Sequence, residues 1–466
     1  MIRLFSHYIP GSLMLLAALE LLVLLIAAYA VTSLHVIGSN ASISFSTQGV
    51  PFLLVPVFAV GMVLVMSSMG LYQAELWNNT TAIRVRLVLA FLLGFVITSF
   101  VSQLMPPLYP SPLEVGATIM IVALAGSLLV RAAFLKWNSQ GVFKSRVLVL
   151  GTGSRVVKLA QYAERNPNHQ VIGYIALQPA EHYISSRHIL TMTPGESLLS
   201  VVEKNAIDQI VIAVRDRRSG GFPMQLLLEC RMSGVKVIEL STFFEREYRQ
   251  VMLESLNPSW MVLGDGFRRG QFGNAVKRLF DLLVSAAMLV LTLPIMLAAA
   301  LCIFLESGGP VLFRQERVGQ CGRMFTLFKF RSMRNDAECD GTPKWADIND
   351  NRSTSVGRFI RNWRIDELPQ IFNVIRGEMS FVGPRPERPF FVDQLAKQIP
   401  FYALRHCAKP GITGWAQVRY KYGASIDDAV EKLQYDLYYV KNQSLFLDLM
   451  ILISTAEVVL WGKGAR

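Results

Sequence analysis

Four long apolar stretches dominate the first third of the chain. They cover residues 11–37, 49–72, 84–104 and 113–135. Each approaches or exceeds the roughly 20 residues that cross a bilayer core. The charged residues near the middle of a stretch are Glu20 and Arg131, which is less polarity than a transport pathway shows. The pattern predicts a four-helix transmembrane bundle at 1–137 that serves as an anchor or assembly platform. Buried helices of a large soluble domain are the alternative.

The basic residues around these stretches predict the orientation of the bundle. The loops 38–48 and 105–112 contain no Lys or Arg, whereas the other ends of the stretches are basic. By the positive-inside rule, both ends of the bundle and everything after about residue 137 lie in the cytosol. The first stretch is too long, and followed too soon by others, to be a cleaved signal peptide. The basic positions are Arg3, Arg84, Arg86, Arg131, Lys136, Lys144 and Arg146.

After the bundle, short β-branched runs alternate with helical segments. This predicts an open, parallel, Rossmann-like α/β domain over 144–250. A glycine turn containing Gly151 and Gly153 follows its first strand, but Val156 stands where a third glycine completes the dinucleotide-binding motif. No acidic residue closes the second strand where a ribose contact is expected. We therefore favour a sheet kept for regulation or assembly over one that binds a nucleotide.

A fifth apolar segment begins the last part of the chain. Residues 282–305 are long enough to cross the membrane, but both flanks are basic, so a simple crossing breaks the positive-inside rule. Pro294 lies near the middle, removes a backbone donor and can bend the helix sharply. Ser285 or Thr292 could offer a hydroxyl to the freed carbonyls. We predict a re-entrant helix at 278–306, with a spanning helix and a buried helix as the alternatives.

The end of the chain, "LFLDLMILISTAEVVLWGKGAR", is also apolar but is interrupted by Asp448 and Glu457. One interpretation is a helix in the membrane interface, with Trp461 and Lys463 at its edge. The other is a helix that docks on the protein core or in a dimer.

Composition narrows the function classes. The 466 residues are 52% hydrophobic and 17% charged, with a formal net charge of +12. The basic residues form no long tract of the kind that binds nucleic acid, and they suit anionic lipids and phosphorylated substrates better. Five scattered cysteines without a C-x-x-C motif and six histidines without an H-x-x-x-H pair disfavour a disulfide framework and a zinc site.

The candidate chemistry lies in the last third. Asp366 and Glu367 stand just before a Leu-Pro pair, and Asp366 alone could be a helix N-cap. Two rigid turns follow, one with Pro384 and Arg385 in "GPRP" and one in "KPGITGWAQV" at 409–418. Paired carboxylates, rigid turns and a basic segment predict a site for a phosphoanhydride, with a carboxylate attacking phosphorus and a metal offsetting charge. The basic segment contains Arg314, Arg317, Arg323, Lys329, Arg331 and Arg334; attraction to anionic headgroups is the alternative for each.

From about residue 275 the chain resembles the bacterial sugar transferases, the monotopic polyprenyl-phosphate phosphoglycosyl transferases. The resemblance rests on "KRLFDLLVSAAMLVLTLPIML", "GPVLFRQERVGQCGRMFTLFKFRSM", "GRFIRNWRIDELPQIFNVIRGEMSFVGPRP" and "KPGITGWAQV", which stand in the family's order. The four spans and the middle domain are similar to the long, exopolysaccharide-initiating subgroup. The wording "RNWRIDELPQ" resembles its exosortase-associated members.

The resemblance implies an α/β-type catalytic domain at 274–466, after a linker at 251–273. It implies that Asp366 attacks the β-phosphate of a UDP-sugar, releases UMP and passes the covalent sugar phosphate to undecaprenyl phosphate. Glu367 would support Asp366, and the two would place Mg²⁺. The family's re-entrant helix is also broken at a proline. The phosphate-binding residues would be Arg314, Arg317, Lys329, Arg331 and Arg385.

The same resemblance implies a multi-pass protein of the bacterial inner membrane that contacts membrane lipid, with its soluble domains in the cytoplasm. It also suggests a homodimer, and no nucleic acid is expected. One alternative is direct transfer, with Asp366 as base or metal ligand. The other is a non-catalytic Rossmann-type sensor or scaffold of a polysaccharide assembly complex. The motifs do not indicate which sugar is transferred.

Overall fold

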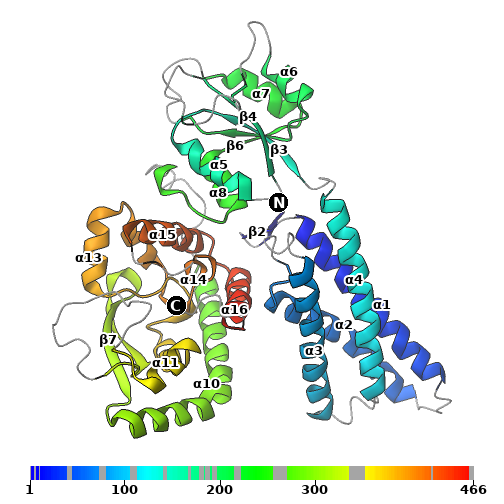
Figure 1. Cartoon of the computed structure of the whole chain (residues 1–466), viewed down its shortest axis with the longest axis vertical. Helices are drawn as coiled ribbons and strands as arrows, with labels where there is room; N and C mark the ends of the chain where they lie inside the picture. Colours follow the sequence, from blue (N-terminus) through cyan, green and yellow to red (C-terminus); the bar gives the residue numbers. More distant parts are fainter. Residues whose placement is uncertain are drawn as a thin grey trace. The chain divides into compact units, whose positions relative to one another are not determined.

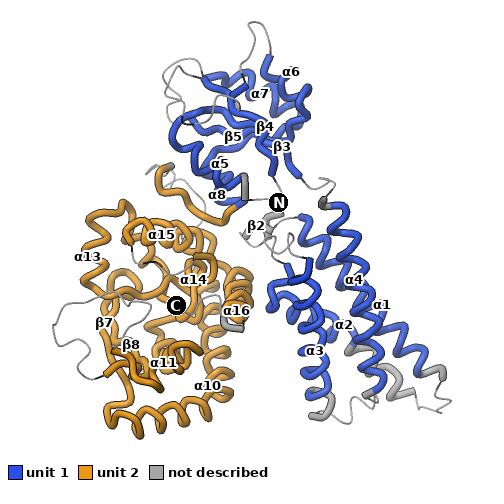
Figure 2. Tube along the Cα trace, in the orientation of Figure 1, with its two compact units in different colours: residues 1–2, 9–247 blue, residues 3–8, 248–466 orange. Residues whose placement is uncertain are grey.

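The computed structural model divides the chain into two compact units, residues 1–2 with 9–247 and residues 3–8 with 248–466 (Figure 2). The division after residue 247 lies close to 250, where the predicted middle domain ends. The structure describes residues 2–4, 7–9, 11–38, 45–72, 80–104, 113–139, 144–165, 169–177, 183, 189–190, 197–214, 222–255, 270–334, 352–420, 423 and 425–460.

The four predicted spans near the N-terminus all form helices, which lie side by side (Figure 1). Three of them, α1, α3 and α4, are long and apolar enough to cross a membrane, and α2 adds a shorter apolar part at Val55–Ser68. Two short strands, β1 (Ile2–Leu4) and β2 (His7–Ile9), pair with each other. The helices are α1 (Gly11–Gly38), α2 (Phe45–Ser68), α3 (Thr80–Leu104) and α4 (Leu113–Ser139).

The two charged residues noted in the middle of the apolar stretches bind each other. Arg131 Nε donates to Glu20 Oε1 at 2.6 Å and Arg131 Nη2 donates to Glu20 Oε2 at 3.0 Å. Arg131 Nη1 also donates to the Leu71 carbonyl, and both charged side chains are buried in the bundle. Because an unpaired charge in a bilayer is costly, this pairing allows both residues to lie within a hydrophobic bundle. It joins α1 to α4 rather than lining a pathway.

The middle of the chain is a four-stranded, fully parallel sheet in the order β4-β3-β5-β6. Its core holds Leu148, Ile175, Ile210 and Leu227, and helices separate the strands along the chain. The predicted α/β region with a parallel sheet is confirmed. The elements are β3 (Ser145–Leu150), α5 (Arg155–Arg165), β4 (His169–Ile175), α6 (Leu198–Lys204), β5 (Gln209–Ile212), α7 (Met224–Met232), β6 (Lys236–Glu239) and α8 (Leu240–Glu247).

The glycine turn lies where the first strand meets its helix, as the sequence predicts. Gly151 has φ +122°, a conformation that favours glycine, and its N–H donates to the Ile175 carbonyl at 2.8 Å. The turn therefore joins β3 to the neighbouring strand β4 and leads into α5.

The part of the second unit after residue 247 contains a short 3₁₀ helix, η3 (Leu253–Ser255), and then a 37-residue helix, α10 (Gln271–Ser307), which contains Pro294. Figure 1 shows α10 as two arms that meet at a sharp bend. A proline in a helix removes one backbone hydrogen bond and clashes with the preceding turn, which explains a bend in this segment. Thr292 Oγ1 donates to the Met288 carbonyl at 2.7 Å. Ser285 is buried, and its hydroxyl finds no hydrogen-bond partner in the described part of the chain.

Both ends of α10 are attached to the rest of the second unit. Near its start, Lys277 pairs with Asp448 at 2.9 Å, and Asp281 accepts a hydrogen bond from Ser380 Oγ at 3.0 Å. At its end, the Glu306 carboxylate accepts from the Ser355 N–H at 2.9 Å. Between these ends the helix exposes large apolar side chains, among which are Val290, Leu291 and Leu305.

The remaining elements form a compact domain around a main hydrophobic core. Leu433, Tyr438, Val374 and Met379 are nearly inaccessible in this core. The elements are β7 (Leu312–Val318), η4 (Gln320–Gly322), β8 (Met324–Phe330), α11 (Ser355–Asn362), η5 (Ile365–Glu367), α12 (Gln370–Arg376), β9 (Ser380–Val382), α13 (Pro389–Gln398), η6 (Tyr402–Cys407), β10 (Gly411–Thr413), α14 (Trp415–Arg419), α15 (Ile426–Lys441) and α16 (Leu445–Leu460). A smaller hydrophobic cluster joins α10 to β8 and α11.

The apolar C-terminal segment packs on this core as α16. Leu447 and Ile451 are fully buried, and Asp448 accepts a hydrogen bond from Tyr439 at 2.8 Å besides its ion pair with Lys277. The interruption that the sequence shows at Asp448 is therefore a buried contact, which favours the docking interpretation. The proposed edge residues, Trp461 and Lys463, lie outside the described residues.

Candidate active site

The Asp-Glu pair lies in a tight turn between two helices. Asp366 and Glu367 belong to the 3₁₀ turn η5, which joins α11 to α12, and both side chains are buried. Arg364 begins this turn in the left-handed region, at φ +54°. The N-cap of α12 is Pro369, and Asp366 caps no helix. The N-cap interpretation of Asp366 is therefore wrong, because the turn intervenes between the pair and the helix.

Three cations surround the Glu367 carboxylate. Arg385 Nη2 donates to Glu367 Oε1 at 2.8 Å, and Lys329 Nζ donates to the same oxygen at 3.1 Å. Arg364 Nη1 lies 3.6 Å from Oε2. Arg385 comes from the "GPRP" turn and Lys329 from β8, so Glu367 joins three separate segments through its charge. Hydrogen bonds of this charge-assisted kind are about twice as strong as neutral ones.

Asp366 has a different environment from its neighbour. Among the residues that the structure describes, none forms a hydrogen bond or ion pair with its carboxylate. Burial and the adjacent Glu367 charge raise the pKa of Asp366. Burial alone would also raise the pKa of Glu367, but Arg385, Lys329 and Arg364 hold that pKa well below its ordinary value. The cations therefore keep Glu367 ionised, whereas Asp366 has a raised pKa and its carboxylate accepts no hydrogen bond from the described residues.

The two rigid turns predicted from the sequence lie against each other. Strands β9 and β10 pair in parallel, with Ser380 opposite Gly411, and the Gly411 N–H donates to the Pro384 carbonyl at 2.9 Å. A Cβ on Gly383 would collide with the Lys409 carbonyl, and a Cβ on Gly411 would collide with the Gly383 backbone. Glycine is therefore required on both sides for the backbones to approach this closely. The contact fixes the turn that carries Arg385.

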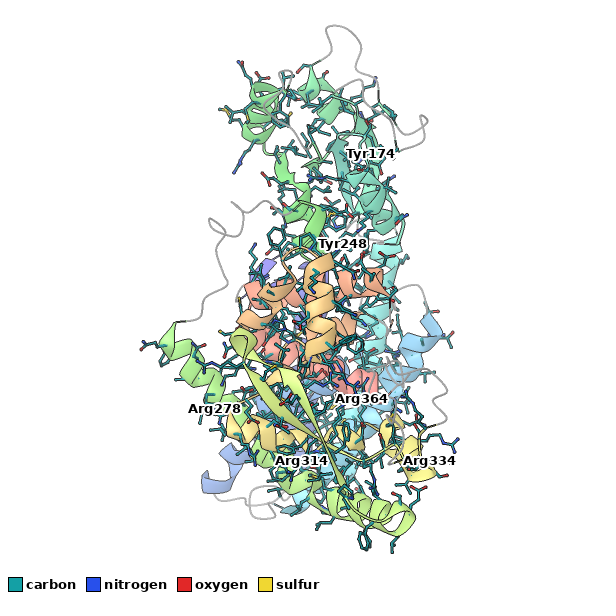
Figure 3. All side chains as sticks on the ribbon, turned by 90° about the vertical axis from the view of Figure 1, so that its left-hand side faces the viewer. Tyr174, Tyr248, Arg278, Arg314, Arg334 and Arg364 are labelled. Atoms are coloured by element: carbon teal, nitrogen blue, oxygen red, sulfur yellow. The ribbon has the colours of Figure 1, made fainter. Side chains whose placement is uncertain are left out.

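The other predicted phosphate-binding cations have varied surroundings. Arg317 Nη1 donates to the Pro386 carbonyl at 3.0 Å, and burial lowers the pKa of Arg317 to about 10. Arg331 Nη2 donates to the Ser307 hydroxyl at 2.7 Å and to the carbonyls that end α10. Arg314 lies on β7 (Figure 3). Its guanidinium is 5.8 Å from the centre of the Phe328 ring. Lys329 and Arg385 thus meet at the Asp366–Glu367 pair, here called the dyad, whereas Arg317 and Arg331 hold backbone carbonyls.

Several residues near the site did not stand out in the sequence. Arg364 completes the cations around Glu367, and Arg278 of α10 donates to two carbonyls at the end of α12. Arg405 and Asp436 form a buried pair behind the "GPRP" turn. The proximity of Arg364 to the acids, at the reach of an i, i+3 pair, is a signal that sequence reasoning can use. The other contacts join segments far apart in the chain.

The carboxylates of the Asp-Glu pair can offer a magnesium ion only a few protein ligands. No cluster of three or more His, Cys, Asp and Glu side chains suited to a metal occurs within the described ranges. Mg²⁺ needs fewer protein ligands, because it usually keeps waters and binds one or two carboxylates together with substrate phosphates. The Asp366 carboxylate is available for this role, while Glu367 Oε1 is already bound by two cations. The pair therefore fits a Mg²⁺ ion held chiefly by Asp366 and by substrate.

Comparison with known proteins places the chain in a family. Residues 272–462 match the family model described as bacterial sugar transferase. The UDP-N-acetylgalactosamine-undecaprenyl-phosphate N-acetylgalactosaminephosphotransferase of Aeromonas hydrophila is 36% identical over 84% of this chain and 90% of its own length. UDP-glucose:undecaprenyl-phosphate glucose-1-phosphate transferases of Xanthomonas campestris pv. campestris and Klebsiella pneumoniae are 34% and 33% identical, over 75% and 70% of this chain and 73% and 70% of theirs.

These relatives confirm the predicted resemblance and the prediction of a transferase enzyme, while the exosortase-associated placement stays a prediction. They extend over both units of the chain, since each spans 70% or more of it. The chain therefore belongs to the bacterial sugar transferase family.

Proposed function

We propose that this protein transfers a sugar 1-phosphate from a UDP-sugar to undecaprenyl phosphate and releases UMP. We assign this reaction to the first membrane step of exopolysaccharide biosynthesis. The similar proteins named above act on UDP-N-acetylgalactosamine or UDP-glucose, and both donors are candidates here. The observation that carries the proposal is the contrast within the dyad: within the described ranges the Asp366 carboxylate has no hydrogen bond or ion pair, whereas Glu367 has three cations.

This contrast suits a covalent mechanism. An ionised Asp366 oxygen attacks the β-phosphorus of the donor, and the bond from that phosphorus to the bridging oxygen breaks. UMP leaves with the bridging oxygen, and the sugar phosphate stays on Asp366 as a mixed anhydride. A phosphate oxygen of undecaprenyl phosphate then attacks the same phosphorus, and the Asp366 carboxylate leaves.

The contacts of the cations around the dyad assign a role to each of the neighbouring residues. Glu367 stays ionised and holds Arg385 and Lys329 beside Asp366, where their charges face the donor phosphates. Arg317 supports the turn of Arg385 through the Pro386 carbonyl. When bound, Mg²⁺ supplies positive charge to the phosphates and to the leaving UMP. Asp366 is the residue that would hold it.

We propose that α10 is re-entrant and brings this site to the cytoplasmic face of the inner membrane. Pro294 lies in its apolar middle, and the helix bends (Figure 1). Its start is tied to Asp448 and its end to Ser355, which belong to the same compact domain. A straight crossing would place these two ends on opposite sides of the bilayer, whereas a bent helix that enters one leaflet keeps them together. A lipid acceptor and a polar donor can then meet at the dyad.

The covalent step is tested without any lipid acceptor. The purified full chain is incubated with UDP-N-acetylgalactosamine or UDP-glucose and labelled UMP, and intact mass is recorded. We expect label to return to the UDP-sugar and a sugar-phosphate adduct to form on the protein. D366N should abolish both, and D393N, which changes an exposed Asp of α13, should not.

Three outcomes separate the alternatives. Turnover with lipid but without exchange or adduct would establish direct transfer. Polysaccharide output that survives D366N and E367Q in cells would establish a scaffold in place of an enzyme. For the topology, single cysteines at Gly270 and Arg323, in a chain whose own exposed cysteines are replaced, should both be labelled only from the cytoplasmic side. Labelling from opposite sides would refute the re-entrant helix.

A further inference from the structure

A buried ion pair stands directly behind the "GPRP" turn. Arg405 of η6 and Asp436 of α15 are 6% and 2% exposed, and Arg405 Nη2 and Nε both donate to Asp436 Oδ2, at 2.8 and 3.1 Å. Arg405 Nη1 donates to the Tyr402 hydroxyl at 2.7 Å. These bonds leave the guanidinium plane little freedom to move.

The same guanidinium holds the backbone of an active-site residue. Arg405 Nη2 donates to the carbonyl of Arg385 at 3.0 Å, and the Arg385 side chain donates to Glu367 at 2.8 Å. A continuous path therefore runs from Asp436 through Arg405 and the Arg385 backbone to the dyad. Each link in this path is a hydrogen bond to a charged group or from one.

The position of Asp436 explains why the path is rigid. Asp436 lies on α15 between Leu433 and Tyr438, which are both buried in the main core of the domain. The turn carries its own contacts as well, since Pro384 and Pro386 are bound through their carbonyls by Gly411 and Arg317. Arg405 adds the link between them, so three successive carbonyls of the turn are held.

Stability alone is a weak reason for such a pair. Burying two charges costs free energy that their attraction often fails to exceed, and apolar residues of similar size can be as stable or more stable. A buried pair is better explained where it fixes a geometry that apolar packing does not specify. Here the fixed geometry is that of Arg385, whose guanidinium must meet Glu367 and face a donor phosphate.

We propose that Arg405 and Asp436 are positioning residues for the transfer reaction, which they serve by fixing the Arg385 backbone. This proposal rests on the proposed function, because it assigns a role within that reaction. Because both side chains are buried, we assign neither of them a contact with substrate. Their loss should displace Arg385 and lower kcat, while the KM for the UDP-sugar changes less.

A double-mutant cycle distinguishes positioning from a structural role. UMP release is measured with UDP-N-acetylgalactosamine or UDP-glucose and undecaprenyl phosphate for wild type, R405K, R385Q and the double variant. We expect R405K to lower kcat about tenfold or more in the wild-type background. In the R385Q background it should lower kcat less than about threefold, because the residue it positions is already absent.

Two further variants keep the cycle decisive if R405K fails to fold. D436N and Y402F each remove part of the hold on Arg405 with little change of volume, and each should show the same dependence on Arg385. D448N is the matched control, since Asp448 is also a buried, ion-paired acid of this domain but is bonded to Lys277 and Tyr439. Its effect on kcat, if any, should be equal in both backgrounds.

Two kinds of result would contradict the positioning role of Arg405 and Asp436. Equal fold-changes of R405K, D436N and Y402F with and without Arg385 would overturn it, as would wild-type kcat in all three. An absence of UMP release by the wild-type protein with every UDP-sugar would instead refute the proposed function. The variants therefore test the positioning role, and the wild-type protein tests the proposed function, in the same assay.

Discussion

The cluster around Glu367 makes a stability prediction that requires no substrate. E367Q keeps the size and shape of the side chain but removes the charge that Lys329 and Arg385 share. Gln retains one carbonyl oxygen, which can still accept hydrogen bonds but carries no net charge. Lys329, however, would then be a largely buried ammonium beside Arg385 that has lost its hydrogen-bonded anion and keeps only the Asp366 charge nearby, and this is the costly part of the change.

The magnitude follows from the contacts. A hydrogen bond to a charged group contributes about 1.5–3 kcal/mol. Arg385 is 34% exposed in its side chain, so its share is screened, and Arg364 at 3.6 Å and 38% exposed adds little. We therefore expect E367Q to lower the free energy of unfolding by about 3 kcal/mol, the lower end of the range for breaking a buried pair. In a domain of this size that is a fall of roughly 6–12 °C in Tm.

Thermal unfolding of the full chain in detergent or nanodiscs measures this, with E367Q, K329M and the double variant compared with wild type. Because K329M removes the ammonium that has lost its hydrogen-bonded anion, it should restore about 1–2 kcal/mol in the E367Q background while it destabilises the wild type. D393N, on the exposed side of α13, should leave Tm unchanged. An E367Q Tm within 2 °C of wild type, or strictly additive losses in the double variant, would refute the reasoning.

Three further predictions concern activity and local packing. First, burial and Glu367 raise the pKa of Asp366, so UMP release should decline on the acid side at a pH above the ordinary carboxyl pKa of 3.8; a pH–rate profile that stays flat down to pH 3.8 would contradict this. Second, G383A should abolish turnover, because its Cβ meets the Lys409 carbonyl, whereas G270A, where the space is open, should keep the wild-type rate. Equal rates for the two alanine variants would show that turnover does not require the close approach of Gly383 to the Lys409 carbonyl. Third, R331M should lower Tm with little change in the KM for the UDP-sugar, because Arg331 binds the end of α10; a KM increase of about tenfold at unchanged Tm would instead identify a phosphate contact.

The long elements could be predicted because their signals are local. The apolar stretches near the N-terminus became α1 to α4, and the β-branched runs became a parallel sheet, since length and periodicity within one segment decide these outcomes. The pairing of Glu20 with Arg131 was not predicted, although both residues were noted. Their distance along the chain hides the contact, and only the packing of α1 on α4 brings them together.

The site was predicted in its residue types but not in its connections. Strands β9 and β10 are three residues each, too short for a periodic pattern, so their pairing could not be foreseen. Lys329 and Arg331 look equivalent in the sequence, yet Lys329 lies within β8 and meets Glu367, while Arg331 follows the strand and binds Ser307. The end of β8 therefore decides which cation of this basic segment contacts the dyad and which one contacts the end of α10.

In the proposed re-entrant arrangement, the attachment of α10 at both ends gives the bilayer a mechanical role. Arg278, in the first arm, binds the carbonyls at the end of α12, and Glu306, at the end of the second arm, binds the start of α11. The turn with the dyad connects these same two helices. A change in the bend of α10 therefore pulls on both sides of the dyad at once. If α10 is re-entrant as we propose, lipid thickness acts on the site as an effector does, through the geometry of Asp366, the proposed nucleophile.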